Sequence, residues 1–467
     1  MASSQHPNHN IVIFPFMSQG HTLPLLDLSK SLSQRGLTIT IITTPSNAPS
    51  ISKHMQTHPN INIKQIPFPQ VQDLPNGCEN TSQLPSVFYL GPFFAATLQL
   101  KQPFEDALQE MAVSGSLPVC VISDYFLSWS VVGCRKWCIP RLVFMGTGVL
   151  PMAIIKSIPG LVFGSDTDQI RIPGMKLPFS LTLMDMPWLQ KNTNQSDRFN
   201  QLMFQINEWD KESSGVVVNS FMELESEHLS ALESFYKDGC KAWCIGPFLL
   251  HPLSSHTAKN PPESYMEWLG DGKMCKSVIY VSFGSQADIS DAQLDELAYG
   301  LEMSGCLFIW AVKSKTWTPP KGLEERVMGR GLIEREWVDQ HSILTHTATG
   351  GFLSHCGWNS VMESLCAGVP LLAWPLMTDQ PLNAKFVDGL GVGLSVPVKH
   401  GETISVDREM ICELVKELMT SKTGERAREN MQVFAGLARN AMQKGGSSDK
   451  SLTELVEYLC KHKVLSV

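Results

Sequence analysis

The sequence predicts an α/β protein of two doubly wound domains, each built on a mostly parallel sheet. With 467 residues and 43% hydrophobic content, the chain is long enough for two domains of about 200 residues with separate cores. The residues 11–16 have a buried-strand pattern, a leucine-rich helical pattern follows, and 38–43 predict a second strand, which together form a βαβ unit. The stretch 337–380 predicts a strand, a polar turn, a helix and another strand, which is half of a nucleotide-binding unit.

Further patterns place the remaining elements in both domains. A Pro-, Ser- and His-rich run predicts a linker at 251–262, between a first domain at 1–250 and a second at 263–445. The segment 446–467 contains a last helix. The expected strands are 118–124, 140–145, 215–221, 277–285, 307–312, 350–353, 371–374 and 393–396, the expected helices are 93–111, 291–304, 361–367, 407–420, 425–443 and 452–460, and 58–86 is expected to be irregular.

Composition excludes several classes of partner. A net charge of −8 and a pI near 5.9 argue against nucleic acid, which would need a basic face, and favour small-molecule ligands. The twelve cysteines show no CxxC pair or metal spacing, so we expect reduced thiols in a cytoplasmic protein. The apolar run 11–17 has only seven residues, so we expect neither a signal peptide nor stable membrane insertion. We also expect a monomer.

The polar turn in 337–380 lies where a strand ends and a helix begins. Unpaired N–H groups and the positive end of the dipole make a helix N-terminus a ready anion site, and His355, Asn359 and Ser360 all fall there. Asn359 or Ser360 could instead only cap the helix, and Ser360 with Glu363 has the spacing of a capping box. From these residues alone, both interpretations remain open.

The whole stretch resembles the signature box of plant family 1 glycosyltransferases, which use UDP-sugars. The resemblance runs from Trp337 through His355-Cys-Gly-Trp-Asn-Ser360 to Asp379-Gln380, with Asp339 where proline is usual. It implies the GT-B fold, two Rossmann-like domains facing each other across a cleft. The first domain would bind the acceptor, the second the UDP-sugar, and the helix in 446–467 would pack back on the first.

The resemblance also implies a set of donor-binding residues. Trp337 would stack on uracil, Glu363 would bind the ribose, and the turn with His355 would hold the diphosphate, with no metal and no cofactor beyond the UDP-sugar itself. Gln380 implies glucose as the sugar, because an amide that donates and accepts could bridge two neighbouring hydroxyls. The full expected set is Ser285, Trp337, Val338, Gln340, His355, Trp358, Asn359, Ser360, Glu363, Asp379 and Gln380.

Two residues of the first domain are candidates for catalysis. A lone histidine is more often structural, but the loop Ser-Gln-Gly-His21-Thr-Leu-Pro resembles the family's catalytic-histidine loop, and the family places its second catalytic residue at the position of Asp124. From the sequence alone, Asp124 could equally be a helix cap. A neutral His21 could take the acceptor's proton while Asp124 fixes its tautomer, which would give a β-glucoside by inversion.

The sequence says less about the acceptor. An apolar pocket would suit a flavonoid, another phenolic or a terpenoid, although each lining residue could equally belong to the core; the candidates are Phe16, Phe93, Phe126, Met145 and Met186. Another UDP-sugar, a C-, N- or ester-linked product, and a non-enzymatic nucleotide-sugar sensor remain alternatives.

Rival enzyme classes lack their motifs. The chain has no GxSxG, GxGxxG or GxxxxGK[ST], and we find no pair of carboxylates suited to glycoside hydrolysis. One DxD occurs at 166–168, which could bind a metal-nucleotide, but no strand pattern adjoins it.

Overall fold

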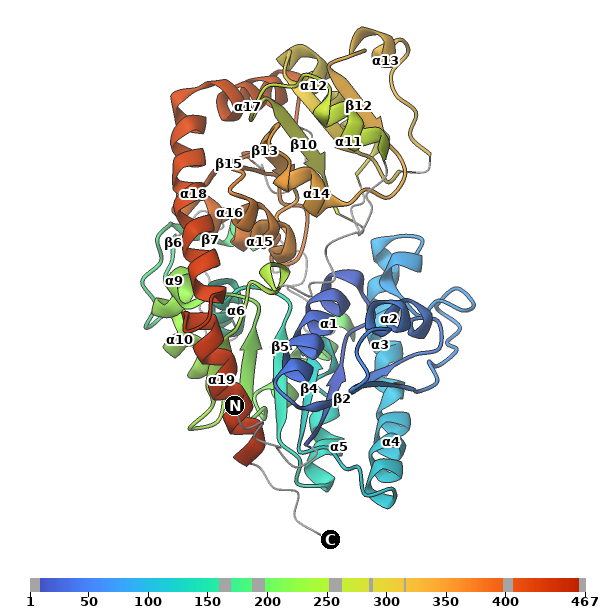
Figure 1. The fold of residues 1–467 in the computed structure, drawn as a ribbon. Helices are drawn as coiled ribbons and strands as arrows, with labels where there is room; N and C mark the ends of the chain where they lie inside the picture. Colours follow the sequence, from blue (N-terminus) through green and yellow to red (C-terminus); the bar gives the residue numbers. More distant parts are fainter. Residues whose placement is uncertain are drawn as a thin grey trace. The chain divides into compact units, whose positions relative to one another are not determined.

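The computed structural model describes residues 9–158, 169–186, 198–251, 263–284, 289–314, 316–397 and 406–461. The chain forms two compact units. Unit 1 comprises 1–159, 194–255 and 440–467, and unit 2 comprises 160–193 and 256–439. Figure 1 labels many of the elements of both units.

Unit 1 is built on a seven-stranded parallel sheet in the order β3-β2-β1-β4-β5-β8-β9. The chain lays down three strands on one side and then crosses to β4, so the order reverses between β1 and β4. In open α/β sheets, ligands bind at such a reversal, outside the carboxyl ends of the strands. The strands are β1 (Asn10–Phe14), β2 (Thr38–Thr43), β3 (Ile61–Gln65), β4 (Cys120–Asp124), β5 (Arg141–Met145), β8 (Gly215–Val218) and β9 (Lys241–Cys244).

Helices cover both faces of this sheet. Alternate residues of a strand point to opposite faces, so Ile11 and Ile13 of β1 join one core and Val12 and Phe14 join the other. The helices are α1 (Gln19–Gln34), α2 (Ala48–Met55), α3 (Leu90–Thr97), α4 (Lys101–Val113), α5 (Ser130–Lys136), α6 (Val149–Ser157), α8 (Arg198–Asp210), α9 (Met222–Glu225), α10 (Leu229–Glu233) and α19 (Ser447–Lys461).

The last helix, α19, belongs to unit 1 although it lies at the end of the sequence. Leu455 and Leu459 are fully buried in the same core as Ile11 and Ile13, and Arg35, which follows α1, forms a 2.5 Å ion pair with Asp449. Apolar burial, more than this partly exposed ion pair, therefore holds the end of the chain on unit 1.

Unit 2 repeats the same topology with a six-stranded parallel sheet, β12-β11-β10-β13-β14-β15. Its reversal falls between β10 (Val278–Ser282) and β13 (Thr349–Ser354). The other strands are β11 (Leu307–Ala311), β12 (Gly331–Glu334), β14 (Leu371–Ala373) and β15 (Gly393–Ser395), and the helices are α11 (Glu263–Gly270), α12 (Asp291–Ser304), α13 (Leu323–Arg326), α14 (Gln340–Thr345), α15 (Trp358–Ala367), α16 (Gln380–Gly389), α17 (Arg408–Thr420) and α18 (Lys422–Met442).

The structure departs from the expected domain limits in one segment. Residues 160–193 belong to unit 2, although they were expected in a first domain at 1–250. In the described part of this segment, β6 (Gln169–Ile170) pairs with β7 (Leu181–Thr182), and Asp185 forms a 3.3 Å ion pair with Lys385 of α16. The core of the expected linker at 252–262 and the DxD at 166–168 lie outside the described residues.

One predicted irregular segment contains a strand. Residues 58–86 were expected to lack regular structure, but Ile61–Gln65 form β3 at the edge of the first sheet. An edge strand pairs on one side only, so it can carry polar residues such as Asn62 and Lys64, which weaken the hydrophobic signal. None of the described helices has both the length and the apolar character needed to cross a bilayer.

Candidate active site

The structure brings His21 and Asp124 together at the reversal point of the first sheet. His21 lies in the first turn of α1, directly after β1, and Asp124 is the last residue of the neighbouring strand β4. His21 Nδ1 lies 2.7 Å from Asp124 Oδ2. Asp124 is fully buried, and its other oxygen accepts the main-chain N–H of Phe126 at 2.9 Å. With Nδ1 donating to the carboxylate, the lone pair that can take a proton is on Nε2.

A glycine makes room for the His21 ring. A Cβ atom on Gly146 would lie 2.7 Å from His21 Cε1 and 2.9 Å from Nδ1, closer than carbon atoms approach. The rings of Phe16 and Phe126 also lie 5.6 Å and 5.5 Å from the imidazole. The sequence shows Gly146 as the residue that follows β5, but not that the histidine ring fills the space beside it.

Most of the expected acceptor-pocket residues are instead core residues. Phe93, Met145 and Met186 have no exposed surface, and Phe16 is 2% exposed. Met186 moreover belongs to unit 2. The expectation that these four line an accessible pocket is therefore not supported, because hydrophobicity does not distinguish a pocket wall from a core. Phe126 is partly exposed beside His21 and is the one candidate that remains at an accessible surface.

In unit 2, the expected anion turn opens α15 at the reversal point of the second sheet. The N-cap of α15 is Gly357, which has no side chain to cap with, so Asn359 and Ser360 lie inside the first turn. The capping interpretation of these two residues is thus wrong. The first-turn N–H groups of a helix have no carbonyl acceptor within the helix, which leaves the start of α15 able to bind an anion.

His355 lies beside this turn, in a space that two glycines keep open. A Cβ on Gly284, which follows β10, would lie 2.8 Å from His355 Nε2, and a Cβ on Gly357 would lie 2.7 Å from the same atom. Burial lowers the pKa of His355 to about 4, so the ring is neutral at pH 7. Its Nδ1 is buried and has no hydrogen-bond partner among the residues that the structure describes.

A polar cluster joins the start of α14 to α15. The side-chain NH₂ group of Gln340 donates to Ser360 Oγ at 3.1 Å and also to the Glu363 carboxylate. The Tyr280 hydroxyl donates to the side-chain carbonyl oxygen of Gln340 at 3.4 Å. Glu363 is thereby held in one orientation. Trp337, which precedes the cluster in sequence, is 55% exposed, as a stacking platform for a ligand would be.

Asp339 has a structural reason to stand where the family usually has proline. It is the N-cap of α14, and its carboxylate accepts from the Ser342 hydroxyl at 2.6 Å. Its own N–H, which proline would lack, donates to Tyr265 Oη at 2.9 Å. The departure therefore adds a cap and leaves Gln340 in the first position of the helix.

At the other end of the box, Asp379 and Gln380 lie at the start of α16. The side-chain carbonyl oxygen of Gln380, Oε1, accepts hydrogen bonds from the main-chain N–H groups of Leu376 at 2.9 Å and Met377 at 3.0 Å. Only the NH₂ side of this amide is left for a ligand, so the expectation that it both donates and accepts is wrong. Asp379 is fixed by the buried Asn383, whose amide donates to it at 2.9 Å.

The remaining donor candidates divide into three cases. Trp358 is 2% exposed and packs against Phe386, so its indole does not reach a ligand and only its main chain could. Val338 is partly exposed next to Trp337. Ser285 lies outside the described residues, although the preceding Gly284 is beside His355. Among the described residues, no three His, Cys, Asp or Glu side chains are grouped as a metal site would need.

Unit 1 holds a paired histidine and carboxylate, and unit 2 holds a helix N-terminus that can bind an anion and an exposed tryptophan. Together with the two doubly wound sheets, these are features of a nucleotide-dependent transferase. Comparison with known proteins agrees with this class. Residues 253–426 match the family described as UDP-glucoronosyl and UDP-glucosyl transferase, and residues 8–136 match a glycosyltransferase N-terminal domain.

Relatives match over nearly the full chain. UDP-glycosyltransferase 90A1 of Arabidopsis thaliana is 36% identical, covering 99% of this chain and 98% of its own. Scopoletin glucosyltransferase of Nicotiana tabacum is 35% identical, covering 95% and 96%. The structure of Phytolacca americana UGT2 with UDP-2fluoro-glucose and pterostilbene has a TM-score of 0.82 at 26% identity, covering 97% and 99%.

The chain therefore belongs to the plant family 1 UDP-glycosyltransferases and has their GT-B fold. It is an enzyme that transfers a glycosyl group from a UDP-sugar to a small acceptor.

Proposed function

We propose that the protein transfers glucose from UDP-glucose to a hydroxyl group of a small hydrophobic acceptor, with inversion, to give a β-glucoside. The observation that carries this proposal is the 2.7 Å contact between His21 and the buried Asp124. A protein that only sensed nucleotide sugars would need the box of unit 2 but no such pair. The name of the tobacco relative and the pterostilbene in the Phytolacca americana structure support a phenolic acceptor.

The reaction follows from the tautomer of His21. Nε2 takes the proton of the acceptor hydroxyl while its oxygen attacks C1 of the sugar from the side opposite the diphosphate. The bond from C1 to the phosphate oxygen breaks, and its electron pair leaves with UDP. Asp124 stabilises the imidazolium that forms, as a buried carboxylate does in hydrolase triads. Direct displacement turns the α-linked donor into a β-linked product.

The residues of unit 2 suit the three parts of the donor. The exposed Trp337 offers a face to uracil, and base stacking of this kind contributes about 1–3 kcal/mol. The Glu363 carboxylate, fixed by Gln340, can accept from ribose hydroxyls. The α15 N-terminus, with the His355 ring beside it, would receive the diphosphate, so these groups can stabilise the leaving charge without a metal.

The geometry of α16 predicts a preference among donors. The Gln380 NH₂ can only donate and the Asp379 carboxylate can only accept, so each needs a sugar hydroxyl in a fixed place. An epimer leaves one of these groups without its partner, which costs about 1–3 kcal/mol. We expect kcat/KM for UDP-glucose to exceed that for UDP-galactose by about 10- to 100-fold in a competition assay. A preference for UDP-galactose would contradict the assignment of glucose, and a bound UDP-sugar with no turnover on any acceptor would indicate the sensor.

The lowered pKa of His355 predicts the pH dependence of donor binding. In the free protein the ring is neutral above its pKa of about 4, and a bound diphosphate would favour its protonated form. The complex therefore binds more protons than the free protein as the pH falls. We expect the affinity for UDP-glucose to be level above about pH 7 and to rise as the pH falls from about 6 towards 4.

Calorimetry at several pH values, in buffers of different ionisation enthalpy, measures both the affinity and the proton uptake. The matched variant His355→Gln should keep a level affinity throughout. The same pKa shift lowers the stability of the free protein between about pH 6.5 and 4, because the unfolded chain there binds the extra proton. An affinity that falls with pH in the wild-type protein, or that rises equally in the variant, would contradict a contact between His355 and the diphosphate.

A further inference from the structure

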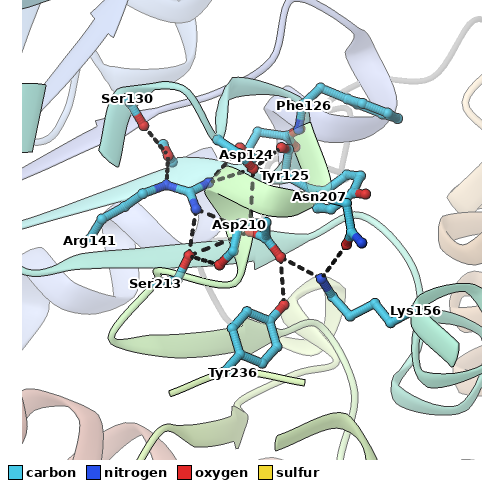
Figure 2. A network of polar contacts seen from close by, with 12 residues as sticks. Asp124, Tyr125, Phe126, Ser130, Arg141, Lys156, Asn207, Asp210, Ser213 and Tyr236 are labelled. Atoms are coloured by element: carbon cyan, nitrogen blue, oxygen red, sulfur yellow. Dashed lines mark hydrogen bonds and ion pairs between the residues drawn. The ribbon is translucent and has the colours of Figure 1, made fainter. Parts of the chain in front are cut away.

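A buried network of charged groups contacts the main chain of Asp124, the partner of His21. Its three charged members are Arg141 of β5, Lys156 of α6 and Asp210 at the end of α8, all within unit 1 and each at most 5% exposed. Figure 2 shows their side chains converging below the end of β4. The proposed reaction uses none of them, although one contacts Asp124 itself.

Arg141 holds the main chain around Asp124. Its side chain starts opposite Val121, three residues before Asp124, and Nη2 donates to the Asp124 carbonyl oxygen at 3.1 Å. Nε donates to Ser123 Oγ at 2.7 Å, and Nη2 also donates to Ser128 Oγ at 3.4 Å. The guanidinium group of Arg141 therefore contacts the residue before Asp124, the main chain of Asp124 itself, and a serine four residues after it (Figure 2).

Asp210 holds Arg141 in turn. One carboxylate oxygen accepts from Arg141 Nη1 at 3.0 Å, and the other accepts from Lys156 Nζ and from Tyr236 Oη, each at 2.7 Å. Burial alone raises the pKa of Asp210, but the charges of Lys156 and Arg141 and the hydrogen bonds from Lys156 and Tyr236 outweigh it, so the pKa lies below its ordinary value. Asp210 is thus ionised, and it fixes both cations.

The formal charges of this region balance only when Asp124 is included. Arg141 and Lys156 bring two positive charges and Asp210 one negative charge, while Asp124 is a second carboxylate with no exposed surface. Burying a charge is costly unless it is compensated. The excess positive charge of the network therefore lies next to the Asp124 carboxylate, so that the opposite formal charges compensate each other.

We propose that Arg141 is a positioning residue for catalysis, and that the network it forms with Asp210 and Lys156 fixes Asp124 at the distance and orientation that make His21 an effective base. The inference rests on the proposed function. It predicts an effect on the proton-transfer step that is separate from any effect on folding, because the contact of Arg141 is with the residue that orients the base.

The test compares two acceptors in one enzyme preparation. A nitrophenol is largely ionised without help, whereas benzyl alcohol needs a base to become nucleophilic. The ratio of kcat for benzyl alcohol to kcat for the nitrophenol does not depend on the fraction of folded enzyme, so a merely structural role would leave it unchanged.

In Arg141→Lys, an ammonium group can still pair with Asp210 but cannot reach the three groups around Asp124 at once. We expect the ratio to fall by about 10-fold or more, since small displacements of catalytic groups have effects of this size. The Kd for UDP should stay unchanged. Tyr236→Phe is the matched control, because it removes a hydrogen bond to Asp210 without touching Arg141 or Asp124, and its ratio should equal that of the wild-type protein.

Ser123→Ala provides an independent variant if Arg141→Lys does not fold. It keeps every charge and removes the acceptor of Arg141 Nε together with the hydrogen bond between Ser123 and Ser130, so the ratio should fall in the same direction by a smaller factor. An unchanged ratio in a folded Arg141→Lys protein would overturn the inference. If Arg141→Lys does not fold, an unchanged ratio in Ser123→Ala would overturn it. The proposed function fails separately, if the wild-type protein transfers no glucose or if His21→Ala leaves the ratio unchanged.

Discussion

Replacement of His21 by alanine is expected to lower turnover by about 10²- to 10⁴-fold, the usual contribution of a general base. Nε2 of this ring is the proposed proton acceptor, and Asp124 alone has no comparable path to the acceptor hydroxyl because it is fully buried. The proposed UDP-binding residues belong to unit 2, so the Kd for UDP should remain within about twofold of the wild-type value. Steady-state kinetics with benzyl alcohol and calorimetry with UDP measure the two quantities.

Asp124→Asn is the informative companion variant. The Asn oxygen would take over the N–H of Phe126, which leaves the NH₂ group facing His21 Nδ1. The ring must then carry its hydrogen on Nε2, where it cannot accept the acceptor's proton, so activity should fall nearly as far as in His21→Ala. Normal turnover of benzyl alcohol by His21→Ala would show that another group is the base.

Replacement of Asp210 by asparagine is expected to destabilise unit 1 by about 3–5 kcal/mol, because it leaves the buried charges of Arg141 and Lys156 without their carboxylate. Unfolding by urea would measure the loss. If UDP binds unit 2 as proposed, saturating UDP should shift the transition of unit 2 and so identify the transition of unit 1. Tyr236→Phe removes one uncharged donor to the same carboxylate and should cost only about 0.5–1.5 kcal/mol. Equal losses in the two variants would mean that the charges of the network are not what stabilises this region.

The sequence carried enough information for most strands of both sheets because buried parallel strands are nearly continuous apolar runs. The patterns at 38–43 and 291–304 coincide with β2 and α12 to the residue. The strands β3, β9 and β12 were not predicted, and each lies at the edge of its sheet, where a strand pairs on one side only and polar residues are permitted. Residues 160–193 were assigned to the wrong unit because nothing in their composition indicates which sheet they pack on.

The site was predictable as far as local motifs reach. The turn before α15 and the position of Asp124 at the end of β4 follow from strand and helix patterns, and the resemblance supplied their roles. Contacts between distant segments were not predictable. The filled space beside Gly146, the Gln380 carbonyl satisfied by the main chain, and the link from Asp210 to Arg141 all depend on side-chain directions that no local pattern encodes. The same limit led us to predict pocket residues that are core residues.

The most direct test of the account is an NMR time course with UDP-glucose labelled with ¹³C at C1, benzyl alcohol as the acceptor that needs a base, and either the wild-type protein or His21→Ala. The account predicts that the α-linked donor signal is replaced by a β-glucoside signal with the wild-type protein and persists with the variant. An α-linked product, release of free glucose as the main reaction, or equal conversion by the two proteins would contradict inversion by a base formed from His21 and Asp124.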